Sequence, residues 1–88
     1  MPTAIVLNKI MELTLADPAV EYSKPPLTMH IGANSILLAL GISFKNNLTA
    51  EQVAEAIDRI EITIRTQYPE VQRIYIEAKS IAYFAENK

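Results

Sequence analysis

Positions 35–44, which read SILLALGISF, constrain the fold more tightly than any other stretch of the chain. The even positions are all large and apolar, whereas most of the odd positions carry small residues. Successive side chains of a β-strand point to opposite faces of its sheet. The pattern therefore predicts a strand at 35–44 with two largely non-polar faces, of which only the even one has the bulk to fill a core.

The residues before this strand predict a helix and a second strand. Apolar residues recur at helical spacing from Val6 to Leu13, and Asp17-Pro18 ends that run, which predicts a helix over about 2–16. In the segment 27–31, three apolar residues alternate with Thr28 and His30, which predicts a half-buried strand with those two side chains on its outward face. A turn at 32–34 would join the two strands into an antiparallel hairpin.

The second half of the chain predicts another helix and another strand. Thr49 followed by Gln52 is a capping-box pattern, and the apolar stripe after it predicts a helix over about 50–68. Alternation then resumes and predicts a strand over about 72–78. Because a helix connects the strands at 35–44 and 72–78, a right-handed crossover would make those two strands parallel neighbours.

Together these elements predict one α+β domain spanning 1–88 in the order α-β-β-α-β. Both helices would pack on one face of a three-stranded mixed sheet, which leaves the other face open. Residues 19–26 would form a connector. The weakly patterned tail 79–88 carries three large apolar residues, which we expect to fold back or to contact a partner: Ile81, Tyr83 and Phe84.

Composition excludes several classes of function. A net charge of −2 with dispersed Lys and Arg argues against nucleic-acid binding, which needs a clustered basic face. The chain has no cysteine, so disulfides and thiolate zinc sites are excluded. No apolar run approaches the roughly 20 residues that cross a bilayer, so we expect a soluble chain without a transmembrane segment or direct membrane insertion.

The sequence offers little support for catalysis. It contains two glycines and one histidine, and it lacks both a glycine-rich phosphate loop and a Ser-His-Asp arrangement. The loop residues Asn46 and Asn47 follow Lys45 but carry no arginine of the kind an acylphosphatase loop needs. We therefore expect that the protein is not an enzyme.

Several short motifs, in this order and spacing, resemble one known family. They are ADPAV at 16–20, TMHIG at 28–32, LTAE at 48–51, AIDRIE at 56–61, YPEV at 68–71 and RIYIEA at 73–78. With the α-β-β-α-β order, this stretch is similar to the C-terminal cytoplasmic domain of cation diffusion facilitator (cation efflux) transporters. The resemblance runs from about Leu7 to Ser80.

The resemblance implies a ferredoxin-like, metallochaperone-like fold and a non-enzymatic role. Such domains form homodimers at the cytoplasmic side of divalent-cation/proton antiporters, which carry metals such as zinc, manganese or iron. The partners implied are a second copy of the chain and the transmembrane domain of a cation transporter, in cis or in trans. The chain would then be either a domain excised from a transporter or a free-standing homodimerisation and regulatory module.

The family's metal site is not repeated in this sequence. Members that bind metal here place His and Asp at three regions, which in this chain read Tyr22-Ser23-Lys24, Leu38-Ala39-Leu40-Gly41 and Ile74-Tyr75-Ile76-Glu77 without a histidine. An alternative function is that of a soluble metal-binding or metallochaperone-like protein. It would hold a weakly bound zinc, manganese or iron ion on His30 and Glu77, which the alternation places on the same open face. A solvent-exposed or interfacial histidine is the simpler interpretation.

Two surfaces are candidates for the dimer contact. The first is the open sheet face with Leu37, Ala39, Gly41 and Tyr75, because an uncovered face of this polarity favours a partner. Its alternative is a small second core covered by the C-terminal tail. The second surface surrounds Ile62, which points away from the apolar stripe of its helix. A small-molecule sensing module is a third class of function that this type of domain allows.

Overall fold

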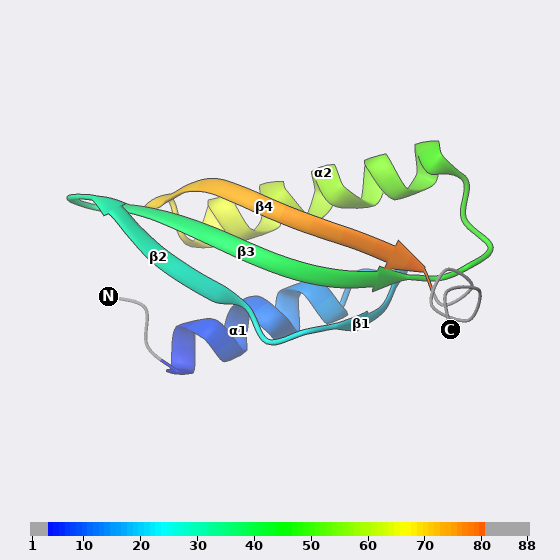
Figure 1. Cartoon of the computed structure of the whole chain (residues 1–88), viewed down its shortest axis with the longest axis horizontal. Coiled ribbons are helices and arrows are strands. Elements are labelled where there is room, and N and C mark those ends of the chain that lie inside the picture. The colour runs from blue at the N-terminus through cyan, green and yellow to red at the C-terminus, as the bar shows by residue number, and fades with distance from the viewer. Residues whose placement is uncertain (1–3, 81–88) are drawn as a thin grey trace.

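The structure is a computed structural model that describes residues 4–80, with the side chains of 4–78. Its centre is β3 (Ser35–Phe44), whose two edges are both paired. On one edge β1 (Val20–Ser23) and β2 (Leu27–Gly32) follow one another and run antiparallel to β3. On the other edge lies β4 (Val71–Ser80), parallel to β3 (Figure 1). The sheet is therefore mixed, as the sequence predicts.

The number of strands differs from the prediction. The expected three-stranded sheet has four strands, because the segment predicted as a connector at 19–26 contains β1. Pro25 and Pro26 lie between β1 and β2, and proline has no N–H to donate to a ladder, so the edge strand is divided in two. The Lys24 N–H still donates to the Gly41 carbonyl at 2.8 Å. β1 and β2 thus form one interrupted edge.

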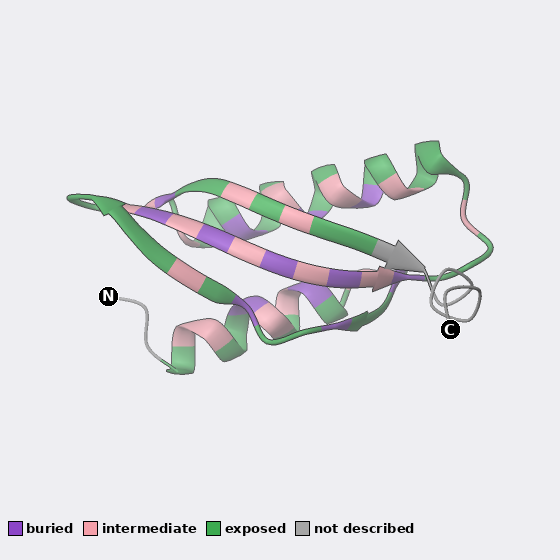
Figure 2. Cartoon of the chain, viewed as in Figure 1, coloured by how far each residue is buried: buried purple, intermediate pink, exposed green. Residues whose placement is uncertain are grey.

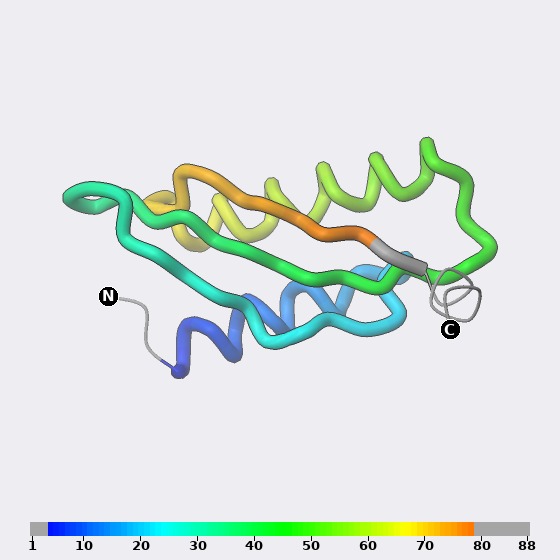
Figure 3. The backbone as a smooth tube through the Cα atoms, viewed as in Figure 1, coloured from blue at the N-terminus to red at the C-terminus, as the bar shows by residue number. Residues whose placement is uncertain are grey.

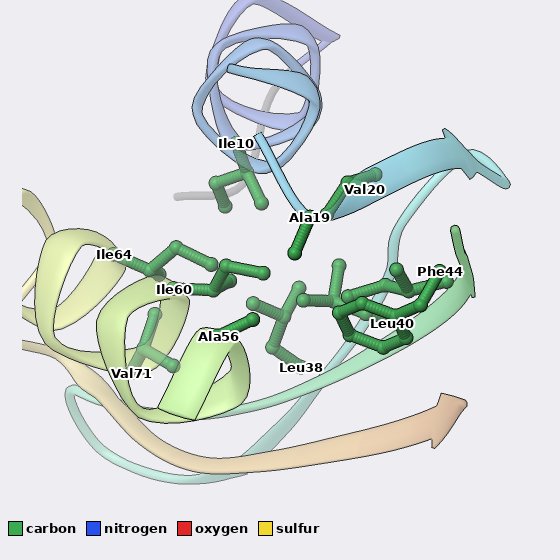
Figure 4. Packing of buried hydrophobic residues seen from close by; sticks show 11 residues of the cluster. Ile10, Ala19, Val20, Leu38, Leu40, Phe44, Ala56, Ile60, Ile64 and Val71 are labelled. Carbon is green, nitrogen blue, oxygen red and sulfur yellow. The ribbon is translucent and has the colours of Figure 1, made fainter. Parts of the chain in front are cut away.

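Both helices cover the same face of the sheet, which confirms the predicted α+β layering. α1 (Ala4–Leu15) and α2 (Ala50–Gln67) lie close to their predicted bounds, and β4 is longer than the strand expected at 72–78. α1 contributes Ile10 to the core, whereas α2 contributes Ala56, Ile60 and Ile64 (Figure 4). These side chains meet the even residues of β3, and burial alternates along all ten residues of that strand (Figure 2).

The buried polar groups of this core are hydrogen-bonded. Thr14 and Ser23 are fully buried, and their hydroxyls donate to the carbonyls of Ile10 at 2.9 Å and Lys24 at 3.0 Å. Among the described residues, no buried side-chain nitrogen or oxygen lacks a partner. The core between the helices and the sheet therefore leaves none of these buried polar groups without a hydrogen bond. Within residues 4–80, no helix is long and apolar enough to cross a membrane.

Candidate functional site

The face of the sheet opposite the helices is the candidate functional site, and we call it the open face. It carries the odd residues of β3 and the residues that the strand register places beside them. Leu27 and Tyr75 flank Ala39, while Met29 and Arg73 flank Leu37. Figure 3 shows the course of the strands that carry this face, in which the β2–β3 hairpin extends beyond both helices.

This face exposes several large apolar side chains. Leu27, Met29 and Tyr75 are 70%, 62% and 59% exposed, and the register places all three on the open face. Tyr22, which is 52% exposed, pairs with Ser43 on the same face. Four of the eight large hydrophobic side chains that are exposed among the described residues therefore gather on one surface. Contiguous apolar surface of this kind marks an interaction site more often than scattered apolar residues do.

The centre of the open face is hollowed. Along β3 the odd side chains shrink from Leu37 to Ala39 to Gly41, so the side chains on the flanking strands rise above the middle one. The result is a shallow hollow of about 270 Å³. It is lined by Lys24, Pro25, Leu27, Ala39, Leu40, Gly41, Tyr75 and Glu77.

Charge on this face is confined to a few positions. Arg73, Tyr75 and Glu77 alternate along β4 and all point to the open side, since their partners on β3 are Leu37, Ala39 and Gly41. The chain therefore carries a positive, an aromatic and a negative side chain in line at one margin of the apolar surface. A second positive side chain, Lys24, lies beside Gly41 on this face: its Cδ atom is 3.1 Å from the position that a Cβ on Gly41 would take.

The structure separates His30 from Glu77, and the prediction that they share a face is wrong. His30 pairs with Ile36 and Thr28 pairs with Leu38, so both point to the helix side of the sheet. Glu77 pairs with Gly41 on the open side. Within one chain the sheet lies between the two side chains, so they do not form a joint metal site.

A β-bulge explains this reversal. Gly32 pairs with Ser35, but His30 pairs with Ile36, so the register of the hairpin shifts by one residue at Ile31. A shift of one residue moves every side chain of a strand to the opposite face. Without the bulge, Ile31 would pair with Ile36 and the apolar residues of β2 would point into the core, as the alternation predicts. With it, Leu27 and Met29 become part of the open face, which the sequence-based prediction missed.

The remaining predicted residues divide into two groups. Leu37, Ala39, Gly41 and Tyr75 come together on the open face. Ile62 is 66% exposed on the side of α2 that faces away from the sheet, since Ile60 and Ile64 on either side of it are buried. It therefore belongs to a different surface. The predicted tail residues Ile81, Tyr83 and Phe84 lie outside the described residues.

Metal-ligating side chains do not cluster in the described part of the chain. Within residues 4–80 there is no group of three or more His, Cys, Asp or Glu placed to hold one metal ion. Zinc in proteins is usually held by three or four such ligands. Metal binding by His30 or Glu77 remains a prediction from the sequence, and the observed geometry gives it no joint site.

The fold of this chain recurs in solved structures of MamM C-terminal domains. The nickel form of one MamM C-terminal domain variant matches with a TM-score of 0.77 and 18% identity, covering 89% of this chain and 98% of that one. A second variant matches with a TM-score of 0.78 and 19% identity over 90% and 98% of the two chains. A cadmium form matches with a TM-score of 0.76 and 18% identity over 88% and 95%.

These neighbours confirm, at the level of fold, the resemblance predicted from the sequence. MamM C-terminal domains belong to the cation diffusion facilitator family and have the ferredoxin-like fold expected here. No protein-family model and no curated protein sequence matches the chain.

Proposed function

We propose that this chain is a C-terminal domain of the cation diffusion facilitator type that acts as a non-enzymatic homodimerisation and regulatory module. Its place would be the cytoplasmic side of a membrane, where it would hold together two protomers of a divalent-cation/proton antiporter. The transmembrane domain would be joined to it in cis or bound in trans. The motifs at 16–20 and 73–78 support this proposal, and so does the shared fold over nearly the whole chain.

The apolar open face is the observation that carries the dimerisation proposal. Four large hydrophobic side chains lie exposed on one side of the sheet, while the other side is covered by two helices. Removing such side chains from water contributes about 25 cal/mol for each Å² of apolar surface buried. A second copy of the chain is the occupant we propose, because the same surface offers both apolar area and charges of opposite sign.

Mutation of the open face tests this proposal. We expect the 88-residue chain to have the mass of two chains in size exclusion with light scattering, and Met29→Asp to shift it to the mass of one chain. The aspartate would place a charge without a partner inside the contact, which is strongly unfavourable.

Ile62→Asp is the matched control. It makes the same kind of change at a side chain with nearly the same exposure, 66% against 62% for Met29, on the opposite side of the molecule. We expect this variant to remain a dimer. If Ile62→Asp becomes monomeric while Met29→Asp stays dimeric, the surface of α2 is the contact instead. A wild-type protein that is monomeric at high micromolar concentration would contradict the proposed homodimerisation altogether.

A further inference from the structure

We infer that the two copies meet open face to open face with their strands antiparallel, so that Arg73 of each copy pairs with Glu77 of the other. This inference rests on the proposed homodimer and goes further, because it fixes the orientation and the residue pairs of the contact. Two properties of the open face support it: the order of the charges along β4, and the decrease in side-chain size along β3.

One orientation of the two-fold axis brings the opposite charges of the two β4 strands together. In a two-fold symmetric contact, if residue i touches residue j of the partner, then j also touches i of the partner. An axis that lies between the two faces and crosses the strands at Tyr75 would place Tyr75 against its own copy. Arg73 would then face the second copy's Glu77, and Glu77 would face the second copy's Arg73. Each dimer would contain this ion pair twice.

The shape of β3 favours the same axis independently. The register places Leu37 beside Arg73, Ala39 beside Tyr75 and Gly41 beside Glu77. The antiparallel arrangement would therefore bring Leu37, the largest of the three β3 side chains, against the second copy's hollow, which Gly41 lines together with the Lys24 side chain. In a parallel arrangement Leu37 would meet Leu37 and Gly41 would meet Gly41. The two leucines would hold the sheets apart, and the two glycines would leave a gap between them. Such a contact would be poorly packed, which is unfavourable because protein interiors are close-packed.

The dimensions allow these pairs. Packed sheets lie about 10 Å apart and their strands deviate from alignment by roughly 30°. Arg73 and Glu77 lie two residues from Tyr75 on either side, or about 7 Å along the strand, so such an angle displaces them sideways by roughly 3 Å. A long arginine side chain can follow a displacement of this size. Glu77 also takes part in an interaction within its own chain, which the contact would join or replace.

Charge reversal tests the pairing. We expect Arg73→Glu and Glu77→Arg each to weaken the homodimer at least about tenfold, because each places like charges opposite one another. The double variant Arg73→Glu/Glu77→Arg restores opposite charges at both pairs, so its dimer should approach wild-type affinity. Sedimentation equilibrium measures the three dissociation constants, and circular dichroism checks that each variant is folded.

Mixing the two single variants gives a sharper result. A dimer of one Arg73→Glu chain and one Glu77→Arg chain would have both ion pairs intact, so we expect this heterodimer to form in preference to either homodimer. Native mass spectrometry distinguishes it by mass. The absence of preferential heterodimer formation, or a double variant no tighter than the single variants, would overturn the antiparallel pairing while leaving homodimerisation intact.

One further variant distinguishes face-to-face contact from edge-to-edge pairing of two β4 strands. Both arrangements would bring Arg73 near the second copy's Glu77, but only the face contact covers Gly41. Gly41→Val adds bulk to the hollow, and the three nearest neighbours of the Cβ that it introduces are all atoms of the flexible Lys24 side chain. We expect this variant to fold normally and to dimerise at least about tenfold more weakly. Unchanged dimerisation would overturn the face-to-face contact.

Discussion

At the scale of single residues, Asp17 joins the two helices. Its carboxylate accepts hydrogen bonds from Arg59 Nε at 3.0 Å and from an Arg59 terminal nitrogen at 2.9 Å, and also from the Ala19 N–H at 2.9 Å. The Asp17 side chain is only 8% exposed, whereas that of Arg59 is half exposed. The hydrogen bond from Arg59, with that from Ala19, holds the pKa of Asp17 below its ordinary value against the opposing effect of burial. This contact fixes the end of α1 and the start of β1 against α2.

We expect Asp17→Asn to lower the free energy of unfolding by about 1–3 kcal/mol at neutral pH, because hydrogen bonds to a charged partner are among the stronger ones in proteins. Since the folded-state pKa is lowered, the contribution of Asp17 is present above its ordinary value of about 4 and is lost as the pH falls through the folded-state pKa. Urea unfolding at neutral pH and at about pH 3 measures the difference between variant and wild type, which should shrink in acid.

Asp58→Asn is the control for this experiment. It makes the same chemical change on α2 at an exposed residue, and we expect a change within about 0.5 kcal/mol. An Asp17→Asn variant as stable as this control, or one whose loss persists unchanged in acid, would contradict the role given to Asp17.

At the scale of elements, α2 begins at a complete capping box. The Gln52 N–H donates to Thr49 Oγ1 at 3.1 Å, and the Thr49 N–H donates to Gln52 Oε1 at 2.9 Å. These bonds satisfy backbone N–H groups that the first turn of a helix leaves without partners. The position matters for the whole chain, because α2 carries three of the buried residues that cover β3.

We expect Thr49→Ala to lower the free energy of unfolding by about 1 kcal/mol, the usual effect of losing a helix cap. In a domain of this size this loss corresponds to roughly 4–8 °C in the melting temperature. Differential scanning calorimetry measures it. Thr49→Ser keeps the hydroxyl and should remain close to wild type, so equal losses in both variants would mean that the cap is not the cause.

At the scale of the whole molecule, the two sides of the sheet differ in how they are covered. The helix side is buried under α1 and α2, whereas the open face exposes Leu27, Met29 and Tyr75. If a second copy covers the open face, the folded state is stabilised by association, and its stability depends on protein concentration.

We therefore expect the melting temperature of the wild-type protein to rise with protein concentration. Calorimetry over a range of about a hundredfold in concentration would measure this rise. The Met29→Asp variant should have a melting temperature independent of concentration, because it would unfold as a monomer. A wild-type melting temperature that does not change over this range would contradict stabilisation by the dimer.

Much of this fold could be predicted from the sequence because the relevant signals are local. The alternation at 35–44 predicts β3, the capping box predicts the start of α2, and the intervening helix predicts that β3 and β4 are parallel. Each signal depends on the geometry of one strand, one helix end or one crossover. The sequence by itself therefore determined the two layers of the molecule and the covered face of β3.

Tertiary structure alone decided which side chains share the open face. The bulge at Ile31 reverses β2, so that His30 points to the helix side while Leu27 and Met29 join Tyr75. The pairing of β1 with β3 likewise appears only in the folded sheet, because two prolines interrupt its edge. The physical reason is that register is a relation between strands: the alternation within one strand identifies its two faces, but the pairing with its neighbour decides which face is buried.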